Sequence, residues 1–261
     1  MRHKPSPGPA LLVFVLYLIV IVGVSKLLGA DYDDIGKTAD ATLKGAVIPV
    51  ICSSVLVAAA TSYLGWWRPA LHDRQKATSR LPWIAVVLAV VGVILTALST
   101  VWSKLDVSVV LLVAVAVILV GFSEELMTRG LLLTGFRGRF REGMAWFLSS
   151  LCFGLMHASN VINGQAVGTT IQQVYTTFMA GTLLYIIRRV TGTLIWAMAF
   201  HAVYDFVSLS FSASGGTGLA AAVVFVANIA AVALVYFAIK HAREGTGADR
   251  GVASDAAAQP A

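Results

Sequence analysis

Long apolar runs, separated by short polar segments, follow one another along most of the chain. A helix needs about 20 predominantly apolar residues to cross a bilayer. Eight runs come close to this length, so the pattern predicts an all-α, polytopic membrane helix bundle with about eight transmembrane helices. The predicted spans are approximately 10–28, 42–64, 81–101, 107–133, 144–159, 168–187, 194–211 and 219–239.

Composition agrees with this pattern. Of the 261 residues, 58% are hydrophobic and 12% are charged, and the mean hydropathy is +0.82. Soluble domains are about 45–50% apolar and about 25% charged, so the composition excludes a soluble enzyme, a disordered chain and a fibrous repeat. The two cysteines, Cys52 and Cys152, lie inside apolar runs, which is typical of small core residues.

Loop charges predict the orientation of the chain. With the N-terminus in the cytoplasm, the cytoplasmic segments carry 14 Lys and Arg residues and the opposite side carries 4. This bias follows the positive-inside rule, and an even number of spans puts both termini in the cytoplasm. It also explains the net charge of +6. No basic run alternates with aromatic residues, so we expect no nucleic-acid partner.

The predicted organisation has four parts. Residues 1–106 form N-terminal transmembrane helices, 107–211 a catalytic core, 212–240 a C-terminal transmembrane helix, and 241–261 a disordered cytoplasmic tail rich in Gly, Ala and Asp. The first apolar run is longer than the 7–15 residues typical of a signal peptide, so we expect an uncleaved first helix. The predicted location is the cell membrane, with a multi-pass topology.

Ionisable residues inside the spans are few and lie on three helices. A charged group near the centre of a bilayer costs roughly 2.5–3.5 kcal/mol on the insertion scale, so such groups must face one another or a wet cavity. Apart from Lys26 and Lys44, which lie within a few residues of the ends of the first two spans, the predicted fourth, fifth and seventh spans hold them all. They are Glu124, Glu125, Arg129, His157, His201 and Asp205.

Helical spacing sorts these residues into pairs. Glu125 and Arg129 are four residues apart, so they share a helix face and can form an ion pair. Glu124 is turned by about 100° from its neighbour, which leaves its carboxylate free to act as a general base. His157 follows Phe153 by four residues, so the two rings can pack together. Asp205 follows His201 by four, so the acid can orient the imidazole.

From this chemistry alone, an enzymatic site, a proton- or ion-coupled transporter and a structural role all remain open. A single membrane histidine is often a helix–helix hydrogen bond. Six ionisable residues on three helices favour a functional site over a purely structural role. Transporters often have duplicated halves and helices broken by Gly or Pro, and neither feature is visible here.

Three motifs in this region resemble those of a known family. The first is EExxxR at Glu124 to Arg129, the second is FxxxH at Phe153 to His157, and the third is Hxxx(N/D) at His201 to Asp205. Their order, each on its own membrane helix, is similar to that of the CPBP intramembrane proteases. These are relatives of the type II CAAX-prenyl endopeptidases and of bacteriocin-processing and self-immunity proteins. The resemblance covers approximately 107–211.

The resemblance implies an intramembrane endopeptidase with its site in a cavity open toward the cytoplasm. It assigns the activation of a water molecule to Glu124 and His157, and oxyanion stabilisation to His201 and Asp205. Glu125, Arg129 and Phe153 would support the helix geometry. The chain departs from the family at the last position, where many members have Asn. A carboxylate donates no hydrogen bond unless protonated, so orienting His201 is the role we expect for Asp205.

Metal dependence is a separate question. Glu124, His157 and His201 form a set of two histidines and one carboxylate, which is an alternative site for Zn²⁺. The HExxH helix of many zinc peptidases is absent from the sequence. We therefore expect a glutamate-activated water without a cofactor.

The expected partners are the lipid bilayer and a protein or peptide substrate, with or without a lipid modification. The alternative to an enzyme is a non-enzymatic membrane protein, either a proton-coupled transporter or an immunity or regulatory scaffold.

Overall fold

The computed structural model describes residues 2–216 and 220–240. The predicted tail 241–261 and the first residue of the last predicted span, Leu219, lie outside the described residues. In the part that is described, the chain is helical with no strand, which confirms the all-α prediction. The longer helices are α1 (Pro7–Leu27), α3 (Ile48–Leu64), α5 (Trp83–Ser99), α6 (Val107–Glu125), α8 (Glu142–Met156), α9 (Val167–Thr191), α10 (Ile195–Ala213) and α11 (Ala220–Ile239).

Shorter helical segments connect or extend these helices. They are α2 (Ala39–Thr42), α4 (Trp67–Leu71), α7 (Leu133–Arg137), two π-helical segments (Leu43–Val47 and Leu126–Leu132) and three 3-10 turns (Tyr32–Asp34, Trp102–Lys104 and His157–Val161). Each predicted apolar run therefore corresponds to one long helix, with ends that differ by a few residues.

Four continuous helical stretches are long and apolar enough to cross a membrane. They are Pro7–Leu27, Ala39–Leu64, Val107–Arg137 and Ala222–Ile239, and Trp83–Ser99 is a shorter apolar helix. An all-α membrane bundle therefore fits the structure. The helices α8, α9 and α10 do not meet the same criterion among the described residues. With 15 residues, α8 is shorter than the four stretches above.

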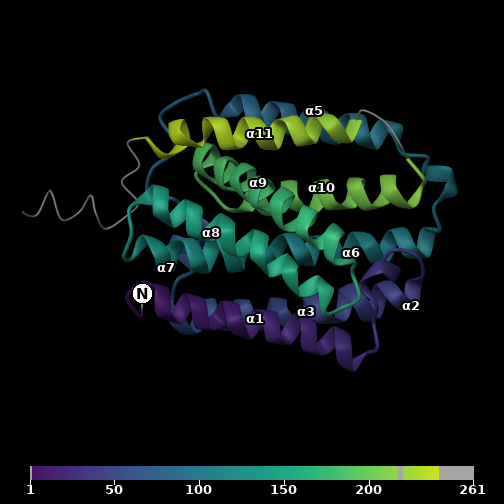
Figure 1. Cartoon of the computed structure of the whole chain (residues 1–261). Helices are drawn as coiled ribbons and strands as arrows, with labels where there is room; N and C mark the ends of the chain where they lie inside the picture. Colours follow the sequence, from purple (N-terminus) through teal and green to yellow (C-terminus); the bar gives the residue numbers. More distant parts are fainter. Residues whose placement is uncertain (1, 217–219, 241–261) are drawn as a thin grey trace, which may run out of the picture.

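The helices form three layers (Figure 1). One outer layer is the pair α1 and α3, and the other is the pair α5 and α11. Between them, α6 contacts both α3 and α10, while α9 contacts α8 and α11. The three helices that carry the ionisable residues are thus enclosed between two apolar helix pairs.

The helix that begins at Val107 is longer than the sequence predicts. It continues from α6 through the π-helical segment Leu126–Leu132 into α7, and so ends at Arg137 instead of residue 133. A π-helical turn widens the helix locally and often marks a functional site. Here it begins directly after Glu124 and Glu125.

The arginine-rich end of the bundle is closed by a buried ion network. The Asp73 carboxylate accepts hydrogen bonds from Arg137 (2.9 Å), Arg188 (2.7 Å) and Arg189 (2.8 Å). Glu142 adds a second carboxylate, which binds Arg137 through two nitrogens, at 2.9 and 2.6 Å. The loop after α4 is thereby tied to α7, α8 and α9.

The count of cytoplasmic charges includes Arg137, Arg188 and Arg189 as loop residues, but their side chains are at most 8% exposed. Burial alone raises the pKa of the Asp73 carboxyl, and the guanidinium groups of Arg137, Arg188 and Arg189 outweigh burial and hold that pKa well below its ordinary value.

Substituting Asp73→Asn would leave three guanidinium groups around a neutral amide. Removing one partner from a buried ionic cluster costs about 3–5 kcal/mol. We expect a clear fall of the thermal unfolding midpoint in detergent. The control is Asp40→Asn, which breaks an exposed pair with Lys44 and is expected to change stability little.

The pH dependence gives a second measurement of the same network. The pKa of Asp73 is lower in the folded state than the ordinary value of about 3.9. The stabilising contribution of Asp73 is therefore complete when the pH is above the ordinary, unfolded-state pKa. It is lost as the pH falls from there through the lower pKa of the folded state. Wild type should lose stability as the pH is lowered from about 4.5 toward 2.5, and Asp73→Asn should lose less. Equal losses in both proteins would contradict this role of Asp73.

Candidate active site

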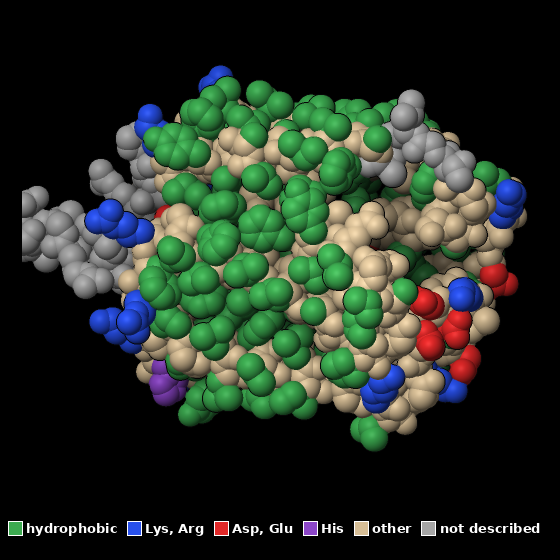
Figure 2. Space-filling view, viewed as in Figure 1, with side chains coloured by type: hydrophobic (Ala, Val, Ile, Leu, Met, Phe, Trp, Pro, Cys, Tyr) green, Lys and Arg blue, Asp and Glu red, His purple; other side chains and the backbone are tan. Residues whose placement is uncertain are grey.

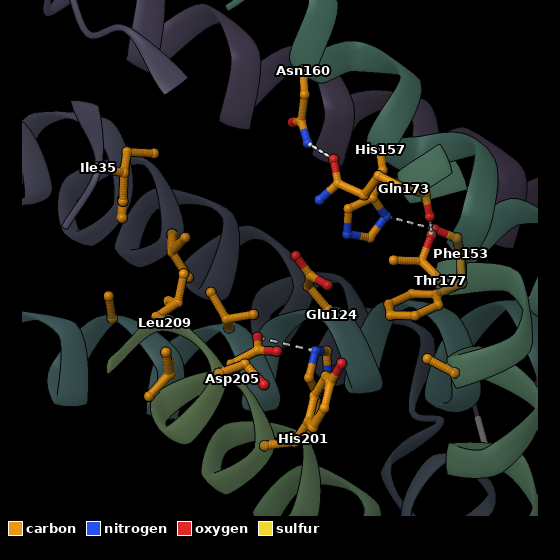
Figure 3. Close-up of a pocket in the computed structure, with 18 of the residues that line it drawn as sticks. Ile35, Glu124, Phe153, His157, Asn160, Gln173, Thr177, His201, Asp205 and Leu209 are labelled. Carbon is orange, nitrogen blue, oxygen red and sulfur yellow. Dashed lines mark hydrogen bonds and ion pairs between the residues drawn. The ribbon is translucent and has the colours of Figure 1, made fainter. Parts of the chain in front are cut away.

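The three motif helices bring their polar side chains to one cavity of about 460 Å³. Glu124 comes from α6, His157 from the C-terminal end of α8, and His201 and Asp205 from α10. Figure 3 shows Glu124 between His157 and His201. Residues far apart in the sequence thus share one space, as the motif analysis expected.

Glu124 has a buried carboxylate that is not tied to a partner. The residue is 9% exposed and lines the cavity. Within residues 2–216 and 220–240, its side chain makes no hydrogen bond or ion pair, although its backbone oxygen accepts a bond from Thr128. The Arg129 guanidinium binds the neighbouring Glu125 instead. Glu124 is therefore available to a ligand in the cavity.

His157 is held in one tautomer by its own helix. Its Nδ1 atom lies 2.9 Å from the Phe153 carbonyl oxygen. Because a carbonyl oxygen only accepts, Nδ1 carries the proton and Nε2 of the neutral ring has a free lone pair. The ring faces the cavity beside Glu124 (Figure 3). His157 can therefore accept a hydrogen bond from a bound molecule.

His201 lies between two carboxylates. Its Nδ1 atom is 3.2 Å from Glu125 Oε1, and its Nε2 atom is 3.3 Å from Asp205 Oδ2. Because a carboxylate accepts hydrogen bonds, Nδ1 can donate to Glu125, and Nε2 lies close enough to Asp205 to form an ion pair when the imidazole is protonated. The contact with Asp205 is the one that the four-residue spacing predicted. The contact with Glu125 was not predicted, because it joins two helices.

Glu125, Arg129 and Phe153 form a support beneath these groups. Arg129 Nη1 donates to Glu125 Oε1 at 2.7 Å, and its guanidinium carbon lies 3.9 Å from the Phe153 ring centre. This cation–π contact stabilises a cation that is fully buried. The Phe153 ring also meets His157 and His201 edge-on, at 5.3 and 5.7 Å.

Gly181 on α9 allows this support to pack. A Cβ atom at Gly181 would lie 2.7 Å from Arg129 Nη2 and 3.0 Å from the Phe153 ring. Any larger residue would therefore push the guanidinium away from the ring.

The donor arrangement does not fit the alternative zinc site. Both nitrogens of His201 lie next to carboxylates, at 3.2 and 3.3 Å, so His201 could ligate a metal only by turning one nitrogen away from its neighbour. Among the described residues, no three His, Cys, Asp or Glu side chains are arranged to hold a metal ion. The expectation that no cofactor is needed remains a prediction.

The cavity extends away from the arginine-rich end. Its lining includes Tyr32 and Ile35 from the first loop, Val113 near the start of α6 and Leu209 near the end of α10. These segments lie at the end of the bundle that carries α2 (Figure 1), where acidic side chains gather (Figure 2). The resemblance implied a cavity open toward the cytoplasm. That expectation remains a prediction, because it depends on the orientation of the chain in the membrane.

Three cavity residues were missed by the sequence analysis. Asn160 donates to Gln173 (2.9 Å), and Gln173 donates to the Tyr32 hydroxyl (3.1 Å). This chain ties the first loop to the 3-10 turn after α8 and to α9. Asn160 follows His157 by three residues, which was a usable signal. Tyr32 had none, because its loop meets the site only in the folded chain.

The fold and the cluster define a helical membrane protein with a buried polar site. Residues 105–207 match the family model described as type II CAAX prenyl endopeptidase Rce1-like. The matched segment contains all three motifs, so the predicted resemblance to the CPBP and CAAX protease family is confirmed for this segment. A comparison with curated proteins and with solved structures gives no match.

Substituting Arg129→Ala should destabilise the protein, because it leaves Glu125 with one cationic partner and removes the cation over Phe153. The expected loss is about 3–5 kcal/mol, measured by unfolding in detergent. The matched control is Arg139→Ala, since Arg139 also lies over an aromatic ring, Phe140, but at 5.8 Å and exposed. Equal stability of the two variants would contradict the supporting role of Arg129.

Proposed function

We propose that this chain is an intramembrane endopeptidase that hydrolyses a peptide bond with a water molecule activated by Glu124 and His157. The observation that carries the proposal is the unpaired carboxylate of Glu124, in a cavity that is also lined by His157 and His201. The family match over 105–207 supports a hydrolase of this kind.

The chemistry begins with a water molecule that donates hydrogen bonds to Glu124 and to Nε2 of His157. As its oxygen attacks the substrate carbonyl carbon, Glu124 takes one proton and a tetrahedral oxyanion forms. The C–N bond then breaks, and Glu124 returns the proton to the leaving nitrogen. One water molecule is consumed, and a carboxyl and an amine are produced.

In this proposal His201 is protonated and supplies the positive charge for the oxyanion. Its Nε2–H turns from Asp205, which is 3.3 Å away, to the oxyanion as that charge forms. A fixed cation in a site of low dielectric stabilises developing negative charge without having to reorganise. Glu125 and Asp205 hold the ring on both sides, which fixes its charge and direction. Asp205 is then a positioning residue for His201, while Glu124, His157 and His201 contact the reacting atoms.

The Glu124→Gln variant tests this assignment. Gln is close to Glu in size but cannot accept the proton, so cleavage should fall by at least about 100-fold with the fold retained. The assay incubates purified protein in nanodiscs with a pool of capped hexapeptides of Ala, Val, Leu and Phe, and detects fragments by mass spectrometry.

The matched control is Thr176→Val, another cavity-lining change, because the Thr176 hydroxyl only bonds its own helix. This variant should cleave like wild type. Cleavage by Glu124→Gln at the wild-type rate would overturn the mechanism. Proton flux through wild-type liposomes without any cleavage would favour the transporter alternative.

Metal removal tests the proposed absence of a cofactor. Cleavage should be unchanged after treatment with 1,10-phenanthroline, because the proposed base needs no metal-bound water. Loss of cleavage that Zn²⁺ restores would instead support Glu124, His157 and His201 as ligands.

A further inference from the structure

Asn228 is a buried amide on a helix that is otherwise apolar. It is the only residue with an amide or charged side chain between positions 222 and 239. The residue is 5% exposed, and its Oδ1 atom has no hydrogen-bond partner in the described part of the chain. Buried polar atoms are usually paired, and an unpaired one destabilises the protein. An unpaired amide here therefore indicates a site that a ligand completes.

The cavity of the candidate active site is the space that Asn228 faces. Asn228 and Val224, one helical turn apart on the same face of α11, both line it. Close packing fixes this face, because α5 approaches α11 at Gly92, where a Cβ atom would lie 2.7 Å from Val224. Asn228 cannot turn away from the cavity without breaking that packing. This part of the chain lies outside the matched segment 105–207.

The shape of the cavity suits an extended chain. Its lining follows α10 from Phe200 to Leu209, which corresponds to about 13 Å along a helix. An extended peptide advances about 3.3 Å per residue, so about four residues fit. Along α6 the lining residues form a single stripe that leads to the base. They are Val113, Ala116, Val117, Val120 and Glu124.

We propose that Asn228 is a substrate-positioning residue that binds one backbone amide of an extended apolar peptide whose scissile bond lies at Glu124. A carboxamide donates and accepts, as a peptide group does, so it can pair with a backbone N–H and C=O. The apolar stripe of α6 takes the side chains. The position of the scissile bond at Glu124 rests on the proposed function. Binding of the peptide by Asn228 does not require cleavage.

Binding is measured without cleavage in the Glu124→Gln background. The immobilised protein in nanodiscs is equilibrated with the same capped hexapeptide pool, and the retained peptides are quantified by mass spectrometry. Adding Asn228→Leu should weaken retention by about tenfold, the loss of one hydrogen bond. Asn228→Gln, which keeps the amide, should stay within about threefold of its parent. Ile229→Ala, on the exposed side of α11, should have no effect.

Two further readouts separate positioning from a structural role. Asn228→Leu removes an unpaired buried polar atom, so its thermal stability should equal or exceed that of its parent. In addition, hexapeptides with one amide replaced by an ester lack one N–H. At a single position, the ester should weaken binding to the parent and not to Asn228→Leu.

Each outcome decides the inference. Equal retention by the parent and Asn228→Leu, no retention of any peptide, or a loss of retention matched by a loss of stability would overturn it. Retention that depends on Asn228, without cleavage by the Glu124-containing protein, would support the subsite while refuting the proposed function. Cleavage by an Asn228→Leu protein at the wild-type kcat/KM would refute the subsite alone.

Discussion

The shared carboxylate oxygen of Glu125 is the contact on which the rest of the site depends. Oε1 of this residue accepts from Arg129 at 2.7 Å and from His201 at 3.2 Å. A bundle between apolar helix pairs cannot hold isolated charges, because desolvation of each one is costly. One buried anion that contacts both residues allows the π-helical segment after α6 to carry Arg129, and α10 to carry His201, in the same small volume.

This arrangement explains why two adjacent glutamates differ in what they can do. Consecutive residues point in different directions on a helix, so Glu125 faces the cations while Glu124 faces the cavity. Phe153 lies between Arg129, which packs over the face of the ring, and the two histidines, which meet the ring edge-on. The side of this cluster that faces the cavity keeps the unpaired carboxylate of Glu124 and the Nε2 atom of His157.

The two ends of the bundle are held by different interactions, an ion network at one end and neutral hydrogen bonds at the other. At one end, Asp73 gathers three arginines and closes the space between α7, α8 and α9. At the other end, the first loop is held by the polar chain from Tyr32 through Gln173 to Asn160, and the cavity reaches that loop. The loop at this end is held by neutral hydrogen bonds, which are weaker than ion pairs.

The sequence by itself determined the class of the protein, the positions of the eight helices and the motif residues of the site. Apolar runs and four-residue spacings are local properties, and they predicted the Glu125–Arg129 and His201–Asp205 contacts. Only the tertiary structure decided that Glu125 also binds His201, that Arg137, Arg188 and Arg189 are buried around Asp73, that the cavity reaches the first loop, and that Asn228 faces it. Each of these depends on how one helix is rotated against another, and many similar apolar faces leave that rotation undetermined in a single sequence.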